Sequence, residues 1–138
     1  MGDDERADEH DIANVLLRYA TGIDRRNWAL FRTCFTEDVL AEYEGLDPWR
    51  SVEEITDFMT TSHVDMGHTM HRLSNLAIAV EGDTATARSY VDAILMAADG
   101  QTGLNPRGFY DDELVRTSNG WRIAHRRFTY VHFGVIGA

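Results

Sequence analysis

The sequence has one cysteine in 138 residues, and its hydrophobic runs are short. Cys34 alone cannot form an internal disulfide, which fits a reducing compartment, so a cytoplasmic protein is expected. None of the apolar runs is long enough to cross a bilayer. The formal net charge of −10 repels phosphate backbones, so we expect no nucleic-acid partner and no membrane partner.

Several motifs of cofactor enzymes are also missing. There is no Gly-x-Gly-x-x-Gly, P-loop, Gly-x-Ser-x-Gly or Cys-x-x-Cys, so nucleotide, flavin and serine-hydrolase chemistry lack support. His63, His68 and His71 are spaced by five and three residues across a predicted loop, unlike a helical zinc pair. We therefore expect no cofactor and no metal.

What is present is a globular composition with 43% hydrophobic residues, which suits one domain over residues 1–138. Residues 1–8 are acidic and are expected to be a flexible lead-in. Apolar residues at three- and four-residue steps predict a helix from about Asp8 to Ile23. Aromatic residues predict a second short helix over 28–35, capped by Asn27 or Asp24. Ser51-Val-Glu-Glu54 is a capping box, which predicts a third helix.

The second half of the sequence alternates with period two, which is typical of strands. After a short strand over 39–43, strands are expected from about Thr69 to 80 and over 84–96, 109–116 and 121–131, with turns at Glu81-Gly-Asp83 and Ser118-Asn119-Gly120. Helices followed by a strand meander indicate an α+β fold. We expect a curved antiparallel sheet packed against three N-terminal helices, forming a cone with one open mouth.

Three polar residues fall where this pattern predicts a mostly apolar interior: Tyr19, Asp24 and His71. A buried carboxylate needs a partner, and a carboxylate paired with a neutral imidazole forms a proton-abstracting dyad. Each residue also has a structural interpretation. Tyr19 suits a core tyrosine, Asp24 a helix cap and His71 a surface or structural position.

Tyr90 and Asp92 share one face of a predicted strand, because side chains alternate. Facing inward, they would bind substrate. In the alternative, Ser89, Val91, Ala93 and Leu95 face inward and Asp92 faces solvent. The apolar candidates for a pocket wall are Phe58, Met59, Leu73, Ile94, Met96, Phe109 and Phe128.

The run from Ile12 to Trp28 resembles the opening of SnoaL-like proteins of the NTF2-like superfamily. Further resemblances are Phe35-Thr-Glu-Asp38, the run from Thr69 to Asn75, Glu81-Gly-Asp83 and the run from Asp112 to Ile123. The resemblance covers nearly the whole chain and implies a cone of curved antiparallel sheet packed with helices. It also implies homodimers or homotrimers formed through the sheet, with residues 131–136 covering a neighbour.

Within this superfamily the sequence most resembles the branch of scytalone dehydratase, bile-acid 7α-dehydratase and hexachlorocyclohexane dehydrochlorinase. The resemblance implies a catalytic Asp24 and His71, with Tyr19 beside them. It implies that Tyr43 polarises a substrate carbonyl, and that Arg126 and Asp92 lie in the site. Ile23 and Leu95 depart from scytalone dehydratase, which has a tyrosine and a second histidine at these positions.

Two classes of function follow. The first is a cofactor-free lyase that removes water or another small group from a small apolar polycyclic, polyketide, steroid or terpenoid substrate, with an isomerase or polyketide cyclase using the same base as its variant. The second is a non-catalytic ligand-binding or assembly module.

Overall fold

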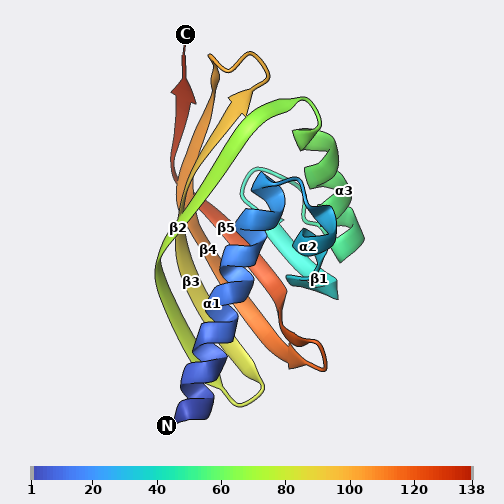
Figure 1. Ribbon diagram of the computed structural model, residues 1–138, viewed down its shortest axis with the longest axis vertical. Coiled ribbons are helices and arrows are strands. Elements are labelled where there is room, and N and C mark those ends of the chain that lie inside the picture. The colour runs from blue at the N-terminus through green and yellow to red at the C-terminus, as the bar shows by residue number, and fades with distance from the viewer. Residues whose placement is uncertain (1, 138) are drawn as a thin grey trace.

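The computed structural model describes residues 2–137, which form one layer of helices against one curved sheet (Figure 1). The helices are α1 (Asp3–Asp24), α2 (Trp28–Arg32) and α3 (Val52–His63). The strands are β1 (Phe35–Tyr43), β2 (Met66–Glu81), β3 (Thr84–Ala97), β4 (Gly103–Thr117) and β5 (Gly120–Ile136). The expected α+β architecture is confirmed. Within the described part of the chain, no helix is long and apolar enough to cross a membrane.

Helix α1 buries the predicted apolar stripe against the sheet: Ile12, Val15, Leu16, Tyr19 and Ile23. It begins at Asp3, earlier than the sequence pattern predicted, so most of the expected flexible lead-in over 1–8 is helical. Acidic side chains stabilise the positive end of a helix dipole, and the carboxylate of Asp8 binds Arg116 and Trp121. These contacts explain why the acidic start of the chain is part of the fold.

The two shorter helices begin at caps that the sequence predicted. Asn27, rather than Asp24, caps α2 by accepting from the backbone N–H of Leu30, which leaves the Asp24 carboxylate for other partners. Ser51 caps α3 by accepting from the N–H of Glu54. Helix α2 ends at Arg32, so Phe35 begins β1 instead of ending the helix, and β1 starts earlier than the predicted Val39.

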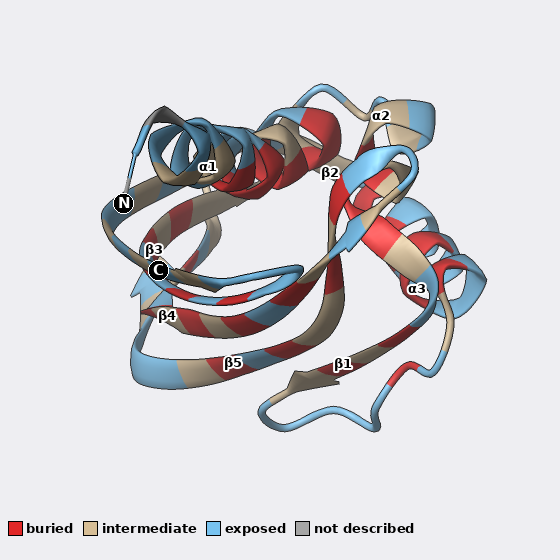
Figure 2. Ribbon diagram, turned by 90° about the horizontal axis from the view of Figure 1, so that it is seen from below, coloured by how far each residue is buried: buried red, intermediate tan, exposed pale blue. Residues whose placement is uncertain are grey.

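The sheet has the strand order β1-β5-β4-β3-β2. The meander from β2 to β5 is antiparallel, as predicted, but β1 pairs with β5 in parallel, so the sheet is mixed. No tight hairpin joins these two strands, which are the first and last in sequence, so nothing local forces them to be antiparallel. Figure 2 shows the sheet curving beneath the helices, with buried residues on the surfaces that face each other.

One glycine brings the helices close enough to position the site. A Cβ on Gly22 would lie 2.9 Å from the backbone nitrogen of Phe31, so α2 can cross the end of α1 only because residue 22 has no side chain. This close crossing sets the direction of the chain after Ile23, where Asp24 ends α1.

Candidate active site

Asp24 and His71 meet where the end of α1 lies against the start of β2. The Nδ1 atom of His71 lies 2.7 Å from Oδ1 of Asp24, and the backbone N–H of His71 donates to Oδ2 at 2.8 Å. Burial raises the pKa of Asp24, but the hydrogen bonds from His71 and Thr69 outweigh it and hold the pKa below its usual range. Asp24 is therefore a carboxylate near neutral pH, and the proton between the two groups belongs to Nδ1.

A second set of contacts holds this carboxylate in place. Thr69 donates from Oγ1 to Oδ1 of Asp24 at 2.9 Å, and Arg26 donates in turn to the Thr69 hydroxyl at 2.8 Å. Arg26 has a left-handed backbone with φ of 55°, and its guanidinium also binds the carbonyl oxygens of Ile23 and Gly67. The arginine thus ties the end of α1 to the start of β2, which fixes the distance between Asp24 and His71.

Two buried tyrosines lie beside the histidine. The hydroxyl oxygens of Tyr19 on α1 and Tyr43 on β1 are 2.7 Å apart, and the ring of Tyr19 meets the His71 ring edge-on at 6.4 Å between centroids. Burial is the main cause that raises the pKa of both tyrosines, so both are neutral hydroxyls at neutral pH. One hydroxyl donates to the other, so one O–H proton of the pair remains available to a ligand.

Arg126 lies behind these tyrosines. Its guanidinium binds the carboxylate of Asp112 through two hydrogen bonds of 2.7 and 2.9 Å, and both side chains are fully buried. The guanidinium carbon lies 4.3 Å from the ring centroid of Tyr19 and 3.9 Å from that of Tyr110. Arg126 was expected to bind substrate, but it does not line the cavity described next. It adds positive charge beneath the tyrosines instead.

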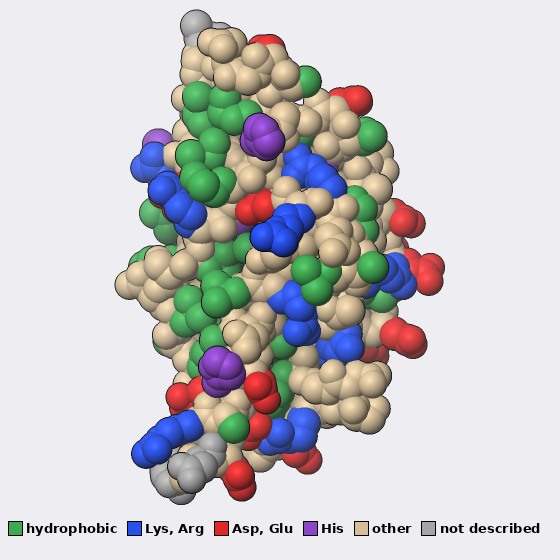
Figure 3. All heavy atoms as spheres, viewed as in Figure 1, with side chains coloured by type: hydrophobic (Ala, Val, Ile, Leu, Met, Phe, Trp, Pro, Cys, Tyr) green, Lys and Arg blue, Asp and Glu red, His purple; other side chains and the backbone are tan. Residues whose placement is uncertain are grey.

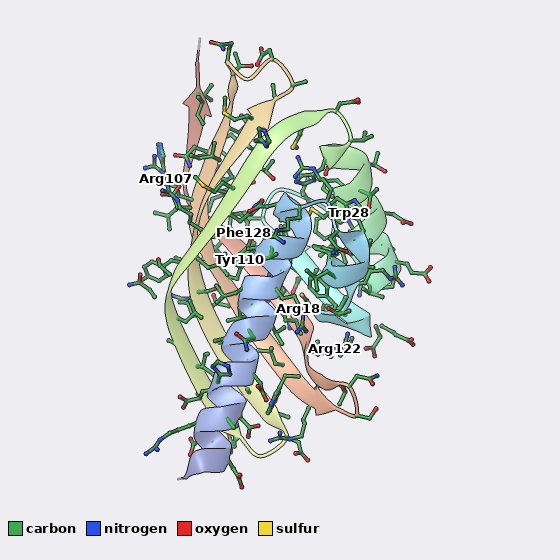
Figure 4. All side chains as sticks on the ribbon, viewed as in Figure 1. Arg18, Trp28, Arg107, Tyr110, Arg122 and Phe128 are labelled. Carbon is green, nitrogen blue, oxygen red and sulfur yellow. The ribbon has the colours of Figure 1, made fainter. Side chains whose placement is uncertain are left out.

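A cavity of about 210 Å³ lies between the helices and the sheet and brings these groups together. In Figure 4, Tyr110 and Phe128 lie near the middle of the molecule. The cavity wall is mostly apolar, and its polar groups are Tyr19, Tyr43, Ser62, His63, His71, Tyr110 and Tyr130. The wall also contains Ile23, Leu95, Phe58, Met59 and Phe128, as the sequence analysis expected of the last three. Leu46, Phe58 and Tyr130 are partly exposed, which places the mouth at their end.

Tyr90 and Asp92 face away from this cavity, so the inward orientation expected for a substrate contact is wrong. Tyr90 is 47% exposed, and Asp92 binds Arg72 and Asn105 on the outer side of the sheet. Arg107, which also contacts Asp92, lies on the side of the sheet away from the helices (Figure 4). The alternative face of β3 lines the cavity with Val91, Ala93 and Leu95.

Four other residues that were predicted for the pocket wall do not line the cavity either. Ile94 and Met96 share the outward parity of Asp92, and Phe109 pairs with Tyr90 on the outer face. Leu73 packs against the core without lining the cavity. Ile94 and Met96 were placed on the inward face of β3, but the inward face is the alternate set that contains Val91, Ala93 and Leu95.

Sequence reasoning missed Asp112, Arg126's partner, and the position of His63. Asp112 shares strand parity with the buried Tyr110 and Leu114, so alternation along β4 could have revealed it. His63 was considered only as a metal ligand, but it lines the cavity. Among residues 2–137, no group of three or more His, Cys, Asp and Glu side chains is placed to hold a metal ion.

Comparison with known proteins finds relatives over most of this chain. Curated relatives include an uncharacterised protein of Mycobacterium tuberculosis, which is 31% identical over 124 residues, covering 88% of this chain and 84% of the relative. Another uncharacterised protein, from Mycobacterium bovis, matches equally well.

Solved structures share the fold over nearly the whole chain. A candidate aromatic ring hydroxylase from Novosphingobium aromaticivorans is 29% identical, with a TM-score of 0.86 over 96% of this chain and 94% of that one. A candidate scytalone dehydratase from the same organism has 20% identity and a TM-score of 0.89, covering 97% and 91% of the two chains. A hexachlorocyclohexane dehydrochlorinase from Novosphingobium barchaimii has 17% identity and a TM-score of 0.78, covering 96% and 90%.

The SnoaL-like domain family matches residues 4–127. That span runs from the first turns of α1 to the middle of β5, and it includes Asp24, His71, Tyr19 and Tyr43. The chain belongs to the SnoaL-like family.

Proposed function

We propose that this protein is a cofactor-free lyase that removes a small leaving group from the carbon β to a carbonyl. The observation that carries the proposal is the 2.7 Å contact between Asp24 and Nδ1 of His71 at the wall of an apolar cavity. Because Nδ1 donates to the carboxylate, the lone pair of the neutral ring lies on Nε2, which has no hydrogen-bond partner among the described residues. A base held in one tautomer in this way is suited to proton abstraction.

The reaction would proceed through an enolate. Nε2 of His71 takes the proton next to the carbonyl, and the electron pair of the broken C–H bond moves into the enolate. The free O–H of the Tyr19–Tyr43 pair donates to the enolate oxygen, with the Arg126 charge behind it. The enolate then re-forms the carbonyl and expels the leaving hydroxyl with its bonding electrons, and the His71 imidazolium protonates it to water. Asp24 stabilises the imidazolium throughout without taking its proton.

The composition of the chain supports a base mechanism over covalent catalysis. The sequence contains no lysine, so a Schiff base between a lysine and a carbonyl is not available. Cys34 is fully buried away from the cavity, and burial raises the pKa of its thiol. Two structural neighbours, named as a candidate scytalone dehydratase and a hexachlorocyclohexane dehydrochlorinase, are named for elimination reactions.

The cavity suggests the size of the substrate. Its volume of about 210 Å³ lies below the range of roughly 300–1,000 Å³ usual for sites that take drug-sized ligands. A carbonyl compound of one or two rings suits it better than a four-ring steroid. The apolar wall favours an aromatic or alicyclic skeleton, and the few polar groups near His71 suit one carbonyl and its leaving group.

The test uses 3-hydroxy-1-tetralone, a two-ring ketone with a hydroxyl β to its carbonyl. Loss of water followed by tautomerisation gives fluorescent 1-naphthol, so turnover can be followed directly. We expect His71→Ala to lower kcat/KM by about 10²–10⁴-fold, the usual contribution of a general base. We expect Asp24→Asn to lower it by more than about 10²-fold, because the amide no longer selects the productive tautomer.

Asp111→Asn is the matched control, because this carboxylate pairs with Arg88 on the outer face of the sheet. It should keep wild-type turnover. Unchanged turnover in Asp24→Asn would remove the Asp24–His71 pair from the mechanism. Tight binding of the tetralone with no naphthol formed would favour the ligand-binding module instead.

A further inference from the structure

His63, at the end of α3, is a second histidine in the wall of the cavity, and its tautomer can be assigned from its contacts. Nδ1 lies 2.7 Å from the carbonyl oxygen of Met59. A carbonyl only accepts, so Nδ1 carries the proton and donates. Burial is the main cause that lowers the pKa of His63, which keeps the ring neutral. In a neutral ring with hydrogen on Nδ1, the other nitrogen, Nε2, is a hydrogen-bond acceptor.

No described residue donates a hydrogen bond to Nε2 of His63. Nε2 is buried and has no hydrogen-bond partner in the described part of the chain, and the residue is only 5% exposed. An unsatisfied buried polar atom is destabilising, so such atoms are rare and are often found at functional sites. His63 is also unlike His71, because no carboxylate binds its ring.

The surroundings of His63 point to a ligand in the cavity as the missing donor. Met59, Ser62, Met66 and His71 border the same space as His63. Methionine side chains are unbranched and move easily, so a small shift of Met59 or Met66 would let a ligand atom approach Nε2. The Trp28 ring stands edge-on to His63, with 5.9 Å between centroids, and limits its rotation.

We propose that His63 is a substrate-positioning residue whose Nε2 accepts a hydrogen bond from a hydroxyl group on the substrate. This inference rests on the proposed function in taking the cavity as the substrate site, and it narrows the substrate to a hydroxylated carbonyl compound. A hydroxyl on the ring skeleton would be held at His63, while the carbonyl meets the tyrosine pair and the acidic C–H meets His71. A hydrocarbon skeleton with a carbonyl alone would leave Nε2 unsatisfied.

The test compares the binding of 1-tetralone with that of its monohydroxylated isomers, measured by titration calorimetry. The wild-type protein should bind at least one isomer more tightly than the parent, by about 2- to 12-fold, the usual worth of one hydrogen bond. In His63→Phe, which keeps a flat ring beside Trp28 but has no acceptor, this preference should disappear while 1-tetralone still binds. His63→Gln restores an acceptor oxygen and should recover part of the preference.

A preference that survives in His63→Phe, or the absence of a preference for any isomer in the wild type, would overturn the proposal. If His63→Phe does not fold, the ¹⁵N resonance of His63 Nε2 in the wild type decides. It should shift when the preferred isomer is added and stay in place with 1-tetralone, and equal responses to both ligands would overturn the proposal.

The test of His63 can be distinguished from the test of the proposed lyase activity. Asp24 does not contact His63, so Asp24→Asn should keep the preference for the hydroxylated isomer even where it abolishes turnover. Lost turnover in Asp24→Asn and lost hydroxyl preference in His63→Phe are independent outcomes of two separate measurements.

Discussion

At the scale of single residues, the carboxylate of Asp24 is held by three donors. They are the ring and backbone N–H groups of His71 and the hydroxyl of Thr69. A carboxylate with so many partners has little freedom to rotate, so the imidazole that it holds is also fixed in direction. Thr69 does not line the cavity, and its hydroxyl donates to Asp24.

Replacing Thr69 with valine should therefore weaken the reaction without removing it. Valine keeps the branched shape but has no hydroxyl, so Asp24 loses one hydrogen bond and Arg26 loses an acceptor. We expect kcat on 3-hydroxy-1-tetralone to fall by about 2- to 12-fold, the value of one hydrogen bond, with KM little changed. Thr69→Ser keeps the hydroxyl and serves as the control. A change in KM alone would mean that Thr69 acts in binding.

At the scale of secondary-structure elements, an outer-face histidine joins three strands. His125 on β5 lies 2.6 Å from Glu42 on β1 and 3.0 Å from Glu113 on β4, one carboxylate at each ring nitrogen. Only the imidazolium can donate from both nitrogens. The hydrogen bond that His125 donates to Glu42 is the main cause that raises the pKa of His125. This link helps to hold the parallel edge strand β1 onto the sheet.

The stability of the fold should therefore depend on the protonation of His125. Because the pKa is raised in the folded state, the stabilisation is complete below the unfolded pKa of about 6.5 and is lost as the pH rises through the folded pKa. At pH 5.5, the free energy of unfolding measured with urea should be higher for the wild type than for His125→Gln, and this difference should shrink towards pH 9. The difference should be small, as for other partly exposed ion pairs. A difference that grows with pH would show that the imidazolium of His125 does not stabilise the fold.

The secondary-structure elements also show how far the sequence could predict the fold. The stripe in α1, the cap at Ser51 and the turn at Gly120 are local signals, and the structure bears out all three. The face of β3 was left open because each set of alternating residues includes several apolar side chains. Its burial depends on partners across the sheet, which alternation alone does not identify. The parallel pairing of β1 with β5 likewise joins segments that are distant in sequence.

The candidate site was predictable to a different degree. Asp24, His71 and Tyr19 were singled out because a polar residue in an apolar pattern is conspicuous. The structure brings the three side chains together, and their catalytic role stays a prediction. Arg126 was named as a site residue, but its partner Asp112 was not recognised, so the buried pair could not be foreseen. A contact between two residues on separate strands depends on register and burial, and neither can be predicted from the sequence of one strand.

At the scale of the whole molecule, the end of β5 carries an unpartnered apolar stripe. Val131, Phe133 and Val135 alternate along the strand and are all at least 45% exposed. They extend into the part of the sheet that the helices do not cover (Figure 1). Figure 3 shows further hydrophobic side chains gathered along the sheet side of the molecule, beside the region of β2. An exposed apolar stripe on a strand commonly packs against another protein surface.

We expect the chain to self-associate through this stripe. Phe133→Glu places a charge on the stripe and should shift the mass measured by light scattering towards that of one chain. Leu17→Glu is the control, since Leu17 is similarly exposed at 45% but lies on α1. A wild-type protein that is already a single chain at the highest soluble concentration would refute the expectation.

If His71 removes a proton from the carbon next to a carbonyl, the protein should catalyse exchange of that proton with solvent. The C2 protons of 1-tetralone are followed by NMR in D₂O, where no leaving group is needed. We expect the wild-type protein to accelerate their exchange, Asp24→Asn to slow it by more than about 10²-fold, and His71→Ala to fall to the rate of buffer alone. Exchange in His71→Ala as fast as in the wild type would rule out His71 as the base.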